Sequence, residues 1–82
     1  MHRLTEKQII AAIKIMFMLT KRKEPWTKIT QKDVANGIGY SQAQTSQICR
    51  HLMHCGIIAR DPEIGIVSGR RAQKYLTIWG VI

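Results

Sequence analysis

Apolar side chains in the first quarter of the chain repeat with the period of an α-helix. Four of them recur at spacings of three and four: Ile9, Ile13, Met16 and Phe17. Thr5 and Gln8 before them have the spacing of a capping box, in which a Thr hydroxyl and a Gln side chain accept hydrogen bonds from backbone N–H groups. The pattern predicts an amphipathic helix from Thr5 to about Arg22 whose apolar stripe faces the core.

A short second helix is predicted next. Thr30 can cap it, although Asp33 stands where a capping box usually has Glu or Gln. Val34 and Ala35 are expected to face inward. The Gly-Ile-Gly sequence at residues 37–39 provides the backbone freedom to end this helix and to begin another at an angle.

A third helix is predicted from about Ser41 to Cys55. Ser41 is its expected cap, no Gly or Pro occurs after it before Gly56, and Gly56 is a stop signal. The predicted core face consists of Thr45, Ile48, Cys49 and Leu52.

The remaining segments predict β-structure. Pro25 favours an extended connection, so residues 26–29 are expected to form a short strand. Residues 57–60 and 73–79 are expected to form two further strands, joined by a loop that contains Pro62, Gly65 and Gly69. The expected order is helix, strand, helix, helix, strand, loop, strand, in an α+β chain of 82 residues that suits a single domain over residues 1–82.

The charge narrows the choice of partner. Thirteen Lys and Arg against five Asp and Glu give a formal net charge of +8, which favours a polyanion. The longest apolar run, residues 9–19, is interrupted by Lys14 and is about half of the roughly 20 residues that a bilayer requires. No secretory signal is evident at the start of the sequence. We therefore expect a cytoplasmic protein that binds nucleic acid rather than a membrane.

The predicted order of elements resembles the winged helix-turn-helix fold of bacterial and archaeal regulators such as the MarR and ArsR families. The resemblance extends from Ile29 to Trp79 and is carried by Ser41, Thr45, Ile48, Leu52, Gly56, Ile57 and Ile58. It implies three helices with a C-terminal β-hairpin wing and a transcriptional regulator that binds double-stranded DNA. A second similarity, to winged-helix modules of phage and plasmid replication or partition initiators, is carried by Leu4-Thr5 with Gln8, Trp26 before Ile29-Thr30, and Gly56-Ile57-Ile58.

If the third helix enters a major groove, the side chains opposite its core face read the bases. The predicted contact residues are Gln42, Gln44, Ser46, Gln47 and Arg50. Gln pairs well with adenine and Arg with guanine, at about 1–3 kcal/mol of discrimination for each good pair. Ser41, Thr30 and Lys32 can add phosphate contacts at helix starts. The alternative for the polar face of the third helix is that it is an ordinary solvated surface.

Cations near the hairpin are expected to contact phosphates or a minor groove. These residues are Arg60, Arg70, Arg71 and Lys74. Asp61 and Glu63 in the first half of the loop would repel phosphate. The Lys21-Arg22-Lys23 run can contact phosphate or can simply balance a helix dipole.

Other chemistry finds less support. His51 and Cys55 are four residues apart and His54 is near, as in metal-sensing ArsR proteins, but a zinc site needs more ligands. We expect no metal, no cofactor and no small-molecule ligand. The chain has no phosphate-binding Gly-rich loop, nucleophile elbow or paired carboxylates, so an enzyme is not expected. Cys49 and Cys55 are expected on different helix faces, unable to pair.

The aromatic residues, the oligomeric state and one further functional class remain to be considered. Trp26, Tyr75 and Trp79 can stack on single-stranded bases, but we expect them to pack in the core, and we expect Tyr40 to be exposed near the turn. A homodimer is expected through the apolar residues left over on the first helix, which are Ile10, Met18 and Leu19. A protein-interaction adaptor whose charge serves acidic partners is the alternative from another functional class.

Overall fold

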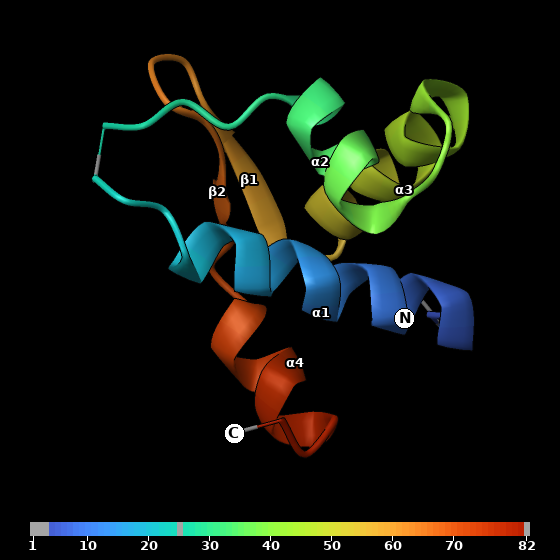
Figure 1. Cartoon of the computed structure of the whole chain (residues 1–82). Coiled ribbons are helices and arrows are strands. Elements are labelled where there is room, and N and C mark those ends of the chain that lie inside the picture. Colours follow the sequence, from blue (N-terminus) through green and yellow to red (C-terminus); the bar gives the residue numbers. More distant parts are fainter. Residues whose placement is uncertain (1–3, 25, 82) are drawn as a thin grey trace.

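The computed structural model describes residues 4–24 and 26–81 as a small α+β structure. In chain order it contains α1 (Glu6–Thr20), α2 (Gln31–Ile38), α3 (Gln42–His54), β1 (Ile58–Asp61), β2 (Gly65–Ser68) and α4 (Ala72–Ile78). Figure 1 shows α2 and α3 on one side of α1 and α4 on the other, with the β1–β2 hairpin beside one end of α1. None of the described helices is long and apolar enough to cross a bilayer.

The first three helices begin where the sequence predicts, each at a complete capping box. Thr5 caps α1 with Gln8, Thr30 caps α2 with Asp33, and Ser41 caps α3 with Gln44. At α2, the backbone N–H of Thr30 donates to the Asp33 carboxylate at 2.8 Å, so Asp serves in place of Glu or Gln.

The turn between α2 and α3 depends on Gly39. Its φ of 77° lies in the left-handed region, and its N–H donates to the carbonyl of Ala35. This geometry ends α2 and lets α3 leave at an angle, as the sequence predicts. Val34 and Ala35 are buried, also as predicted.

The core face of α1 differs from the prediction. The buried residues are Ala11, Ala12, Ile15 and Met16. Phe17 is 54% exposed, whereas Met18 and Leu19 pack against the core and are not left over. The expected stripe was therefore wrong in its rotation about the helix axis. Two small alanines, Ala11 and Ala12, lie on this buried face beside the larger Ile15 and Met16.

The hairpin also differs from the prediction. Its second strand is β2, which pairs antiparallel with β1 in a register that places Arg60 opposite Ile66. Residues 73–79 were predicted as a strand, but residues 72–78 form α4. Tyr75 and Trp79 share a face, as predicted, but they do so at helical spacing, with ring centroids 5.5 Å apart. The hairpin therefore lies between helices and is not C-terminal.

Residues 26–29 do not form a regular strand. Ile29 alone forms an isolated bridge, with Gly65. Its N–H donates to the Ile64 carbonyl at 3.0 Å, and its own carbonyl accepts from the Ile66 N–H at 2.8 Å. These bonds attach the segment before α2 to the tip of the hairpin. The predicted role of Pro25 lies outside the described residues.

Candidate nucleic-acid interface

The third helix presents a polar face opposite its buried one. Thr45, Ile48, Cys49 and Leu52 are buried, as predicted. At about 100° per residue, the centre of the opposite face consists of Ala43, Gln47, Arg50 and His54, all of which are exposed. Sequence reasoning missed Ala43 because of its small side chain and weighed His54 only as a metal ligand. Counting helical positions from the core face would have found both.

The predicted reading residues of α3 divide into two groups. Gln44 turns back toward the start of the helix, where its side-chain oxygen accepts from the Ser41 N–H at 3.4 Å. The Ser41 hydroxyl in turn accepts from the Gln44 N–H at 3.2 Å. Ser41 and Gln44 therefore cap the helix. Gln42 and Gln47 are exposed, and Ser46 is half-buried.

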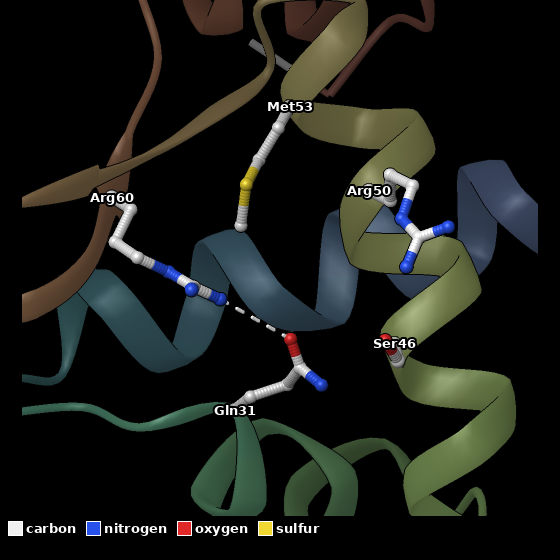
Figure 2. A pocket seen from close by; sticks show the side chains of 5 residues that line it. All are labelled: Gln31, Ser46, Arg50, Met53 and Arg60. Carbon is white, nitrogen blue, oxygen red and sulfur yellow. Dashed lines mark hydrogen bonds between the residues drawn. The ribbon is translucent and has the colours of Figure 1, made fainter.

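An open cleft of about 540 Å³ lies between α3 and β1. It is lined by Gln31, Ser46, Arg50, Met53 and Arg60. Figure 2 shows Arg50 and Ser46 on the α3 side and Arg60 on the β1 side, with Met53 reaching toward the space between them. The Arg60 guanidinium donates to the Gln31 side-chain oxygen at 3.3 Å. Two cations, one from α3 and one from β1, thus share one cleft.

The start of α2 adds polar groups beside this cleft. Gln31, which the sequence reasoning missed, follows the cap and holds Arg60 in place. Thr30 is occupied by the cap, since its hydroxyl and N–H both hydrogen-bond to Asp33. These bonds to Thr30, followed by the charge of Lys32, lower the pKa of Asp33, so a carboxylate sits at this helix start. The predicted phosphate contact at Thr30 is therefore disfavoured. Lys32 is exposed.

Arg70, Arg71 and Lys74 do not lie on the hairpin, contrary to the prediction. Arg70 and Arg71 belong to the turn between β2 and α4, and Lys74 is exposed on α4. They follow the hairpin because its second strand, β2, lies earlier in the chain than predicted. At the tip, the Asp61 carboxylate accepts from the Glu63 and Ile64 N–H groups at 2.8 and 3.1 Å.

The two arginines nevertheless lie close to the C-terminal end of α3. With Met53 and Gly56 they line a second hollow, at the base of the hairpin. Because Met53 lines both hollows, the cations flank it on two sides. We call the four residues Arg50, Arg60, Arg70 and Arg71 the arginine band.

Three further candidates lie outside the cleft and the arginine band. Trp26 is 70% exposed, so the prediction that it packs in the core was wrong. Tyr40 is half-buried, with the Lys7 ammonium 4.8 Å from its ring centroid, and is not the exposed residue that was predicted. Arg22 donates to the Ile66 carbonyl at 2.6 Å, which ties the end of α1 to β2.

The cysteines are free and buried. Burial raises the pKa of both thiols, Cys49 and Cys55, which keeps them protonated and poorly reactive. Among residues 4–24 and 26–81, no group of three or more His, Cys, Asp or Glu side chains lies close enough to hold a metal ion.

Comparison with protein-family models, curated sequences and solved structures found no match for this chain.

Proposed function

We propose that the protein binds double-stranded DNA in the manner of a winged helix, with α3 in the major groove, and that it regulates transcription by occupying its site. The cleft between α3 and β1, walled by Arg50 and Arg60, is the observation that carries this proposal. A helix and a flanking hairpin with cations between them suit a groove and the phosphate strand at its edge.

The roles of the side chains follow from their positions. Gln47 and Arg50 project from the centre of the solvent face of α3 and are the proposed base-reading pair. Arg60, Arg70 and Arg71 lie beside that helix and are proposed to contact phosphates. A net charge of +8 supports binding to a polyanion that depends strongly on salt.

The test is selection of binding sites from random double-stranded DNA, followed by affinity measurements at several salt concentrations. We expect an enriched motif whose preferred bases change in Gln47→Ala and Arg50→Ala, each at a cost of about 1–3 kcal/mol. The motif should be kept in Arg60→Ala and in the double variant Arg70→Ala with Arg71→Ala. The slope of log affinity against log salt concentration should fall by about one for each phosphate contact that is lost.

Lys14→Ala is the matched control, because it removes an exposed cation from α1 and leaves the arginine band intact. Equal losses in Lys14→Ala and Arg60→Ala would show that only net charge matters. Binding with no enriched motif would refute sequence-specific reading, and absence of salt-dependent binding would favour the protein-interaction adaptor. The genomic position of an enriched site separates a regulator from a replication or partition initiator.

A further inference from the structure

The face of α1 that points away from the core is apolar at its centre. The core side consists of Ala11, Ala12, Ile15 and Met16. On the opposite side, Ile10 is 45% and Phe17 54% exposed. A helix that only covered the core would carry polar residues there.

These residues belong to one continuous stripe, which we call the α1 stripe. It consists of Glu6, Ile10, Ile13, Phe17 and Lys21. The spacings of four, three, four and four keep all five residues along one side of the helix, the pattern by which helices pack on one another. The two ends are exposed and carry opposite charges, with Glu6 at the start of α1 and Lys21 at its cap.

An apolar groove continues the stripe toward α4. It has a volume of about 110 Å³ and is lined by Ile13, Met16, Phe17, Thr20, Leu76 and Val81. Ile78 on α4 adds a further apolar side chain that is 64% exposed. A scattered exposed residue needs no explanation, but a stripe joined to a groove marks an interaction surface.

We propose that a second copy of this chain covers the α1 stripe, with the two α1 helices antiparallel about a two-fold axis. Glu6 and Lys21 lie equally far from the midpoint of the stripe, and so do Ile10 and Phe17. In an antiparallel pair each residue therefore meets its opposite number, Glu6 against Lys21 and Ile10 against Phe17. The stripe is thus complementary to itself, which is what a two-fold interface requires.

The surface that such a dimer needs is a small part of the whole. A stable interface takes about 800 Å² from each partner, about a seventh of the 5683 Å² that the protein exposes. The stripe, the groove and the exposed side of α4 are the parts that would supply it in the proposed dimer. None of the stripe residues lines the cleft between α3 and β1, so pairing leaves that cleft open. The proposal does not depend on DNA binding.

The test is the oligomeric state of the purified full chain without nucleic acid, measured by sedimentation equilibrium over a range of concentrations at about 0.15 M salt. We expect a monomer–dimer equilibrium. The double variant Ile10→Ser with Phe17→Ser should be monomeric, with circular dichroism showing that its helices remain. Glu6→Lys and Lys21→Glu should each raise the dissociation constant about tenfold, because each reversal creates two repulsive pairs in the dimer.

Combining Glu6→Lys with Lys21→Glu should restore the dimer. This rescue is diagnostic, because both reversals also oppose the α1 helix dipole, and dipole effects would add rather than cancel. Lys28→Glu, an equal charge change at an exposed site outside α1, should leave the dissociation constant unchanged. A wild-type monomer at all soluble concentrations would overturn the proposal. So would a dimer that persists in the Ser double variant, or charge reversals without rescue, since each indicates another interface or another occupant.

Discussion

Two glutamines three residues apart on α3 lie in different surroundings. Gln44 is part of the helix cap and hydrogen-bonds to Ser41, whereas Gln47 is exposed at the centre of the solvent face. Gln44→Ala should lower the free energy of unfolding by about 0.5–1 kcal/mol, in the range of lost capping interactions. Gln47→Ala should leave stability unchanged and alter base preference. Urea denaturation of both variants, with site selection on each, checks the division. An equal loss of base preference in the two variants would contradict it.

Two glycines with nearly the same backbone conformation should respond differently to alanine. Gly39 and Gly65 have φ values of 77° and 82°. A Cβ on Gly39 would meet no atom within 4 Å, whereas one on Gly65 would collide with the backbone carbonyl of Ile29. Gly39→Ala should therefore cost only the strain of the left-handed conformation, about 1 kcal/mol. Gly65→Ala should cost more, because the hairpin must move away from Ile29. Urea denaturation of both variants gives the comparison, and equal costs would show that the hairpin shifts readily.

At the scale of the element, α3 could be predicted from sequence and the hairpin could not. Ser41, the period of the apolar residues and Gly56 all indicate the same helix, so each local signal supports the others. Gly65 looks like a loop residue, and its place in β2 becomes clear only from its close approach to Ile29, which is distant in sequence. The second strand was therefore placed too late in the chain, and the arginines after it were assigned to the wing.

The rotation of α1 illustrates the same limit. The period of its apolar residues predicted a helix, but two apolar faces were available. The packing of the neighbouring elements selects the buried face, and the face that contains Ala11 and Ala12 was selected. Within the candidate site, the solvent face of α3 was largely predictable, because it follows from the period of a single helix. The cleft was not, because it joins α2, α3 and β1.

The cap of α2 should make this element sensitive to acid. The pKa of Asp33 is lowered from its ordinary value of 3.8, chiefly by the hydrogen bond from the Thr30 backbone. Because the folded-state pKa lies below the unfolded one, the stabilisation is complete above the unfolded value and is lost as the pH falls through the folded value. Asp33→Asn should therefore reduce stability near neutral pH, and its difference from wild type should become smaller as the pH falls below 3.8.

Urea denaturation across this pH range provides the measurement for Asp33. Glu63→Gln is the control, because it removes one carboxylate of the hairpin tip and leaves every helix cap intact. A difference between wild type and Asp33→Asn that stayed constant down to the lowest pH would show that the lost carboxylate is not the cause.

At the scale of the whole molecule, the two cysteines can report on global opening. Cys49 and Cys55 are 0% and 3% exposed, on α3 and at its end, where the helices meet the hairpin. Burial both blocks a reagent and raises the thiol pKa, so alkylation at pH 8 should require unfolding. The rate of alkylation of both thiols should therefore rise with urea concentration in parallel with the equilibrium constant for unfolding.

The same reaction tests whether DNA stabilises the fold as a unit. A ligand that binds only the folded state lowers the population of open molecules, so a selected DNA site should slow alkylation of Cys49 and Cys55 by the same factor. If the proposed DNA binding releases counterions, that factor should shrink as salt is raised. Rapid alkylation of Cys55 alone without urea would instead show that the junction between α3 and β1 opens locally. In that case the cleft between Arg50 and Arg60 would change shape while the rest of the core stayed closed.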